Sequence, residues 1–452
     1  MCELEDRIIA HHVGGRGFGV ALNSPQRFSG DIVNVLYEAD EKCALEMIAQ
    51  NTNENFHVLP YCLGLEDSAS KLYITNNPYS SSNLKPNPEY DAYYCEVALA
   101  GEIDGISMQD TRYDAVYGNE NKVVEVRNVM VHALDTLARD GKVPGNLMPD
   151  FLSLDTQGSE LDILRGAEAT LHDHCVALAT EIEFHPMYEG QALFSSIFDF
   201  ALSHGFYFVG FTYLQEISPH RLPLGARAKG VVAFGDALFF RDIESVRAVA
   251  KSQNELYLML LKLAFIALNF GYLEFALQAV EAADATKADR QFRDRLLERD
   301  CYRLLDDLKR AVNELPASFP HVERSKIIGE RKAVLDRAQS QQADGAQPAA
   351  TSPPAIAGDG QPEQQDRRIR HLLFTDPGAA IGKLVRHFRG PTAASSAPTT
   401  QGAGPTPVTV PPPSPHNTPV EAVLEAYGYV WWADVVRRRR KSAEHCVPGR
   451  MY

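Results

Sequence analysis

Short apolar runs alternate with amphipathic segments over the first 245 residues of the chain. Runs that suit buried strands cover residues 7–12, 32–37, 56–59, 151–154, 176–182, 206–211 and 231–240. Segments with helical spacing lie between them, at 41–50, 160–171 and 193–204. Strands that alternate with helices of this length predict βαβ units and a parallel sheet. Their continuous apolar character is typical of strands that are covered on both faces.

The last two apolar runs have no helix between them, only a loop rich in Pro and Arg. Adjacent strands joined by such a loop pair antiparallel, so we predict a hairpin at the end of the sheet. We also expect Ser159 to cap the helix that begins at residue 160. Gly205 is expected to end the helix predicted at 193–204. Residues 1–245 are therefore predicted to form one α/β domain.

Residues 65–149 interrupt this regular alternation. Within them, the stretch 76–94 is rich in Tyr, Ser, Asn and Pro and is too polar for a core. Short strands are predicted on either side of it, at 71–75 and 122–126. A long insertion in a regular α/β domain is usually functional, so we interpret it as a lid, a substrate pocket or a partner surface.

After residue 245 the sequence pattern changes twice, first to helical spacing and then to a composition typical of disordered chain. Residues 246–335 have apolar positions at helical spacing, which predicts a helical appendage that includes two antiparallel helices joined near residues 269–271. Residues 336–420 are rich in Ala, Pro, Gln, Ser and Gly, a composition typical of disordered chain.

Two basic islands follow the helical region, at 367–389 in the linker and at 421–441 in the final segment 421–452. Basic residues beside Trp and Leu suit a helix that docks on an anionic membrane surface or on a protein partner. A solvated basic end is the competing interpretation. The chain has no signal-peptide pattern at its N-terminus and no run of 18 apolar residues, so we expect a cytoplasmic protein.

The overall charge narrows the function classes. The chain has 452 residues and a net charge of −15, which argues against a general nucleic-acid binder. Its seven cysteines are scattered without a CxxC pair, so reduced thiols are expected rather than a disulfide framework. A small-molecule enzyme remains compatible with this composition.

The first candidate site is the glycine cluster in residues 11–19, which directly follows a predicted strand. Glycines let the backbone turn tightly and approach a ligand, with the N–H groups of a following helix facing that ligand. Glu38 ends the next strand, where doubly wound nucleotide folds place an acidic residue against ribose hydroxyls. These features predict an adenosine-type ligand without separating NAD from other such ligands.

Two further candidates follow later strands. Asp155 closes the strand at 151–154, so it is expected in the same crevice as the glycine turn, although it could equally cap the next helix. Glu181, Glu183 and His185 alternate, so they are predicted to share one face of a strand. His185 is a candidate general base near neutral pH. The spacing of these residues does not favour a metal site.

Residues 150–211 resemble the FkbM family of methyltransferases. The resemblance rests on the ordered motifs LDTQGSELDILRGA and EIEFHPMYEGQ and on the later GFYFVGF strand, and a looser match extends it over about residues 8–241. It implies a Rossmann-like class I methyltransferase fold, with a mostly parallel seven-stranded sheet and a C-terminal antiparallel hairpin. It also implies S-adenosylmethionine as cofactor and a hydroxyl on a small molecule, saccharide or polyketide as acceptor.

Carried over by position, the resemblance places Gly14, Gly15 and Gly17 against the methionine end of the cofactor. Glu38 would hold the ribose, and Asp155 would lie beside the methyl group. The family usually has Asp two residues before the first glycine, where this chain has His12. The chain also begins close to its first strand, so either another segment covers that side of the cofactor or the site is unusually open.

Methyl transfer with Asp155 or His185 as general base is therefore the leading hypothesis. A second hypothesis is an inactive adenosine-ligand-binding protein that acts through its C-terminal helices. An NAD-dependent oxidoreductase ranks lower because the glycines lack GxGxxG spacing. The sequence does not indicate the acceptor or the oligomeric state.

Overall fold

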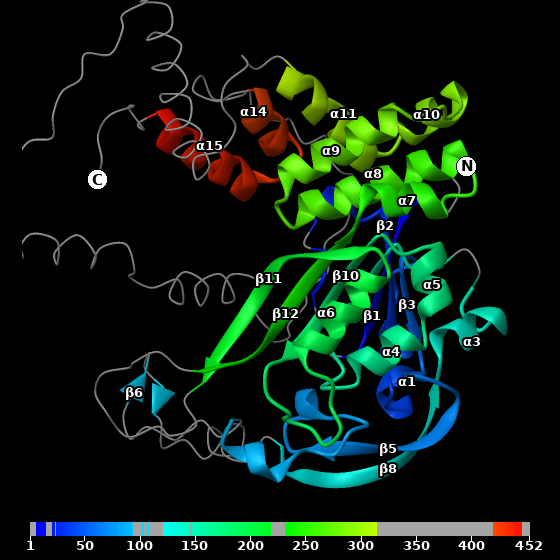
Figure 1. Cartoon of the computed structure of the whole chain (residues 1–452), viewed down its shortest axis with the longest axis vertical. Helices are drawn as coiled ribbons and strands as arrows, with labels where there is room; N and C mark the ends of the chain where they lie inside the picture. Colours follow the sequence, from blue (N-terminus) through cyan, green and yellow to red (C-terminus); the bar gives the residue numbers. More distant parts are fainter. Residues whose placement is uncertain are drawn as a thin grey trace, which may run out of the picture. The chain divides into compact units, whose positions relative to one another are not determined.

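The central element of the structure is a seven-stranded sheet of order β11-β12-β10-β9-β1-β2-β3 (Figure 1). The strands are β1 Ile8–Val13, β2 Ile32–Tyr37, β3 Phe56–Leu59, β9 Phe151–Leu154, β10 Ala177–Glu183, β11 Phe206–Ile217 and β12 Val231–Arg241. The first five pair parallel, whereas β12 pairs antiparallel with both β10 and β11. The predicted parallel sheet with a terminal hairpin is confirmed.

A computed structural model describes residues 6–14, 20–22, 24–93, 102–103, 106–107, 121–144, 147–217, 231–313 and 419–444. All of them belong to one compact unit made of residues 1–318 and 412–446. Most of the predicted linker 336–420, with its basic island 367–389, lies outside the described residues. Among the described residues, no helix is both long and apolar enough to cross a membrane.

Short helices cover one face of the sheet. They are α3 Leu134–Arg139, α4 Glu160–Arg165, α5 Glu168–Asp173 and α6 Phe194–Ser203, and their buried residues pack against one set of alternating strand positions that includes Ile9 and Leu152. The helix predicted at 160–171 is divided in two. The division falls at Gly166, where a Cβ atom would lie 2.0 Å from the carbonyl oxygen of Gly64.

The structure confirms one of the two predicted helix ends and contradicts the other. Gly205 follows α6 with φ +81°, the left-handed conformation that ends helices, as predicted. The prediction that Ser159 caps α4 is wrong, because its side chain makes no capping hydrogen bond. Its hydroxyl instead donates to Thr156 Oγ1 at 2.9 Å.

The helices after residue 241 cover the opposite face. They are α7 Ile243–Val249, α8 Gln253–Asn269, α9 Leu273–Asp284, α10 Arg290–Leu296 and α11 Asp300–Asn313. Every residue of α8 from Leu256 to Asn269 is buried except Leu258, as expected for a helix that is apolar on all sides. It shares one core with Ile8, Ala10 and Phe151 of the sheet. The segment predicted as an appendage is thus a layer of the same core.

A buried ion pair joins this helical layer to the sheet. Lys262 of α8 lies 2.9 Å from the carboxylate of Asp150, with both side chains less than a tenth exposed. Asp150 also accepts a hydrogen bond from the backbone N–H of Ile9 in β1, at 2.8 Å. The pair therefore links α8 to the starts of β1 and β9.

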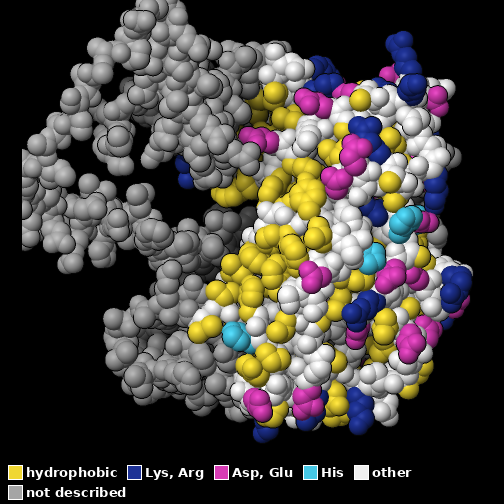
Figure 2. Space-filling view, viewed as in Figure 1, with side chains coloured by type: hydrophobic (Ala, Val, Ile, Leu, Met, Phe, Trp, Pro, Cys, Tyr) yellow, Lys and Arg dark blue, Asp and Glu magenta, His cyan; other side chains and the backbone are white. Residues whose placement is uncertain are grey.

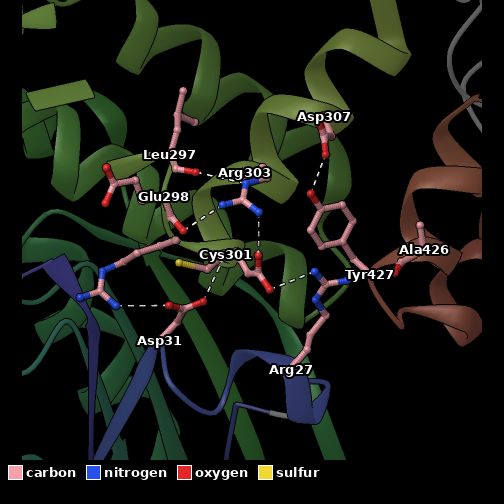
Figure 3. Close-up of polar contacts among 11 residues, drawn as sticks. Arg27, Asp31, Leu297, Glu298, Cys301, Arg303, Asp307, Ala426 and Tyr427 are labelled. Carbon is pink, nitrogen blue, oxygen red and sulfur yellow. Dashed lines mark hydrogen bonds and ion pairs between the residues drawn. The ribbon is translucent and has the colours of Figure 1, made fainter. Parts of the chain in front are cut away.

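The C-terminal helices α14 Pro419–Ala426 and α15 Val430–Glu444 dock on this layer. Figure 3 shows Arg27 between them and α11, where it donates to Ala426 O at 3.0 Å and pairs with Asp300 at 2.9 Å. Tyr427 donates to Asp307 and stacks on the Arg27 guanidinium. The described part of the basic island 421–441 therefore packs on its own chain.

The insertion adds smaller elements. Strands β5 Ser68–Thr75 and β8 Val123–His132 pair antiparallel; β5 includes the predicted strand 71–75, and β8 covers all but the first residue of the predicted strand 122–126. The remaining elements are helix α1 Glu41–Gln50, strands β4 Cys62–Leu63, β6 Glu102–Ile103 and β7 Ile106–Ser107, and the 3-10 turns η2 Gln26–Phe28, η3 Pro78–Ser80 and η4 Pro88–Tyr93. Figure 1 shows β5 and β8 at the opposite end of the sheet from α8.

The outer edge of the sheet carries apolar surface. Figure 2 shows hydrophobic side chains gathered over β11, β12 and α6, and Leu202, Leu214 and Val231 are each at least two-fifths exposed. The two faces of the sheet are covered by helices, whereas this edge stays partly open.

Replacing Gly271 with Ala should release α15 from the core. Gly271 has φ +83°, and a Cβ atom there would lie 1.8 Å from the Trp432 ring. Trp431 and Trp432 are the two tryptophans of the chain, so their emission should shift to the red. Gly141→Ala is the matched control, because Gly141 has φ +70° but open space around it. Unchanged emission in Gly271→Ala would contradict this docking.

Replacing Lys262 with Met should strongly destabilise the protein. It leaves the Asp150 carboxylate buried without its cation, which costs about 3–5 kcal/mol in the free energy of unfolding. Lys251→Met removes an exposed pair with Asp173 and should cost about 0–1 kcal/mol. Urea denaturation followed by circular dichroism measures both, and equal losses would show that the buried pair has no special role.

Candidate functional site

A cleft opens where β1, β2 and β9 end. It encloses about 670 Å³ of space, part of it open to solvent. Gly14, Glu38 and Asp155 follow these three strands directly, and all three line the cleft. The residues predicted from three separate motifs thus meet in one place, at the carboxyl edge of a parallel sheet where α/β folds bind ligands.

Gly14 permits the closest backbone approach in the cleft. It has φ +74°, and a Cβ atom there would lie 2.1 Å from the carbonyl oxygen of Asp155. Only glycine fits this position, because any side chain would collide with the neighbouring strand end. Gly15 and Gly17 lie outside the described residues.

The structure differs from the expectation of a helix after the glycine turn. In the described residues between β1 and β2, the 3-10 turn η2 is the only helical element. The backbone N–H of Val20 instead donates to Ser153 Oγ of β9 at 3.1 Å. The described residues between β1 and β2 therefore supply no α-helix N-terminus to the cleft, whereas Asp40 and Ser159, which precede α1 and α4, line it.

Glu38 is held at the end of β2 by the turn into α1. Its carboxylate accepts a hydrogen bond from the backbone N–H of Asp40 at 2.8 Å. Asp40 caps α1 and pairs with Arg127 of β8 at 2.8 Å, so its charge is compensated. Burial and then the charge of Glu38 raise the pKa of Cys62 to about 11, which keeps this thiol neutral beside the carboxylate.

Asp155 is positioned by the side chain of Gln157. Gln157 Nε2 donates to Asp155 Oδ1 at 3.0 Å and to Glu181 Oε2 at 2.5 Å, while its Oε1 accepts from the Tyr188 hydroxyl at 2.9 Å. Gln157 has φ +61°, a strained conformation for a residue other than glycine. The surrounding hydrogen bonds maintain this strained turn and fix the orientation of the Asp155 carboxylate.

The buried side chain of Glu160 closes the turn formed by residues 155–160, which we call the signature turn. Its carboxylate accepts hydrogen bonds from the backbone N–H of Thr156 at 2.7 Å and of Gly158 at 2.9 Å. Burial raises its pKa, which these hydrogen bonds partly oppose. The spacing of Asp155, Gln157, Gly158 and Glu160 therefore has a structural reason, since one carboxylate closes the turn that presents another.

Further carboxyl groups lie behind Asp155. Glu181 of β10 is directly opposite Asp236 of β12. Burial and then the charge of Asp155 raise the pKa of Glu181 well above its usual range and that of Asp236 to about 7. Burial likewise raises the pKa of Glu183. No group of metal-ligating side chains in the described part of the chain is arranged to hold a metal ion.

His185 does not line the cleft. Strand β10 ends at Glu183, so the alternation that places Glu181 and Glu183 on one face does not extend to His185. Its ring lies 6.2 Å from that of Tyr90. His12 does not line the cleft either, since its side chain is buried in β1 with Nε2 3.1 Å from Asn34 Oδ1.

The insertion forms one wall of the cleft. Pro78, Tyr79, Ser81, Ser82 and Asn83 line it, opposite the strand ends. One hydrogen bond ties this wall directly to the signature turn: Ser82 Oγ donates to Gln157 O at 2.8 Å. The Tyr188 hydroxyl, which bonds Gln157 Oε1, also lies 3.1 Å from Ser80 O.

Sequence reasoning missed several lining residues. Tyr61 and Cys62 follow β3 and line the cleft beside Glu38, and Asn83 lines it from the insertion. Their only sequence signal was position: the first two come just after a predicted strand, and the third lies in the polar stretch 76–94.

The chain is similar to a known protein family and to a solved structure. No curated protein sequence matches the chain. One solved structure that matches is the methyltransferase FkbM from Methylobacillus flagellatus KT, with 13% sequence identity and a TM-score of 0.24. That match covers 52% of this chain and 44% of the other, so the chain spans less than half of that protein. Residues 16–208 of this chain match the family described as the methyltransferase FkbM domain.

Proposed function

We propose that the protein is an S-adenosylmethionine-dependent methyltransferase that methylates a hydroxyl oxygen of a small molecule, a saccharide or a polyketide-like acceptor. One observation carries the proposal: Gly14, Glu38 and Asp155 line a single cleft at the carboxyl ends of three parallel strands. The FkbM domain over residues 16–208 supports the same reaction class.

The side chains of the cleft fit this cofactor. Glu38 provides acceptor oxygens for ribose hydroxyls, and Tyr61, Cys62 and Leu63 provide a less polar surface beside it for the adenine ring. The Gly14 turn allows close approach of the methionine part. Glu38 and Asp155 suit a ligand with positive charge, because no Lys or Arg lines the cleft among the described residues.

When bound, the cofactor supplies a sulfonium methyl group that is already activated for displacement. The protein then has to align the acceptor oxygen, exclude water and remove the hydroxyl proton. Asp155 is placed to accept that proton, since Gln157 holds its carboxylate at the edge of the cleft. The wall formed by residues 78–83 limits access of water to this point.

Replacing Glu38 with Ala should weaken S-adenosylmethionine binding by about 10–100-fold, the loss expected for a charged hydrogen-bond acceptor. Isothermal titration calorimetry measures this affinity, with Glu46→Ala on the exposed side of α1 as the control. NAD serves as a second ligand. Tighter binding of NAD than of S-adenosylmethionine would instead favour the oxidoreductase hypothesis.

Replacing Asp155 with Asn should lower the methyl-transfer rate by about 10²–10⁴-fold, because the acceptor loses its general base. Affinity for the cofactor should change far less. His185→Ala, at a residue that does not line the cleft, should leave the rate nearly unchanged. Transfer of labelled methyl groups to a panel of saccharides and hydroxylated small molecules measures these rates. Binding without any transfer would favour the inactive binding protein.

A further inference from the structure

We infer that Asn83 of the insertion binds the ammonium group of the cofactor's methionine part, through its side-chain oxygen. This inference rests on the proposed function and assigns a contact at the same cleft. It starts from an atom that the protein itself leaves unsatisfied.

Asn83 lines the cleft, and its Oδ1 atom is withdrawn from solvent without a hydrogen bond to any described residue. Buried polar atoms nearly always have a partner, so a specific exception needs an explanation. A ligand in the cleft that donates a hydrogen bond to Asn83 provides one.

The residues on both sides of Asn83 are fixed. Ser82 exchanges two backbone hydrogen bonds with Tyr73 of β5, at 2.8 and 3.2 Å, and its hydroxyl donates to Gln157 O. The backbone N–H of Leu84 donates to Ser82 Oγ at 3.0 Å. Asn83 is therefore held in a defined place, as a ligand contact must be.

These contacts also locate Asn83 along the cleft. Ser82 bonds Gln157, and Leu84 Cδ1 lies 3.3 Å from the position of a Cβ atom on Gly158. Asn83 thus lies at the end of the cleft formed by the Asp155 turn. Glu38, Tyr61 and Cys62 follow different strands, at the end assigned to ribose and adenine.

The chemistry of the cofactor then selects the donor. The adenine amino group and the ribose hydroxyls belong to the Glu38 end, so the ammonium group is the donor available at the Asp155 end. An ammonium carries three N–H donors and requires several acceptors. His12 does not meet this need, because it lies inside the sheet against Asn34.

Calorimetry on the full chain tests the inference with three ligands. S-adenosylmethionine and S-adenosylhomocysteine carry the ammonium group, whereas 5′-methylthioadenosine has the same adenosine and sulfur without it. Asn83→Leu should weaken binding of the first two by about 10–100-fold and leave 5′-methylthioadenosine within about twofold. Asn83→Asp, which can only accept, should bind the first two at least as tightly as the wild type.

Lys85→Ala is the control, because Lys85 is exposed in the same segment and pairs with Glu189. It should leave all three affinities unchanged. Equal losses for all three ligands in Asn83→Leu, or no loss for any, would overturn the inference, as would weaker binding of S-adenosylmethionine by Asn83→Asp. A wild-type chain that binds none of the ligands would overturn the proposed function itself, and the inference with it.

Discussion

The contact between Gly14 and the carbonyl of Asp155 is the constraint on which the site depends. Parallel pairing of β1 with β9 brings these two strand ends together, and there is no room for a Cβ atom between them. The chain must therefore turn sharply after β1. Because Glu38 follows the neighbouring strand β2, the same pairing places its carboxylate beside the turn.

The second requirement is control of negative charge. Asp155 has further carboxyl groups behind it, and burial, followed by the charge of Asp155, raises the pKa of Glu181 and Asp236. The side-chain amide of Gln157 separates Asp155 from Glu181 by donating to both. Glu160 is stabilised differently, by backbone N–H groups of the turn that it closes. A strained residue at position 157 is tolerated because these contacts all favour one conformation.

Much of the fold followed from the sequence because each signal was local. The strands over 32–37, 56–59 and 151–154 have the predicted bounds, since continuous apolar runs of that length suit buried parallel strands. Glu38 and Asp155 could be placed because they follow such strands. Ser159 was assigned wrongly, because its hydroxyl donates to Thr156 Oγ1 and makes no capping hydrogen bond.

The role of the later helices could not be read from the sequence. Helix α8 is apolar on all sides, which indicates burial but does not show against what. Its ion pair joins Lys262 to Asp150, 112 residues earlier, and the C-terminal helices contact Arg27, 399 residues before Ala426. Contacts over such separations leave no local pattern.

The sequence by itself determined the kinds of elements and the strand ends that carry the candidate chemistry, because periodicity and glycine geometry act over a few residues. Tertiary structure decided which of those ends share a cleft, that His185 is excluded from it, and that Asn83 enters it from the insertion. The physical reason is that strand order and helix packing depend on contacts between distant segments, and these exist only in the folded chain.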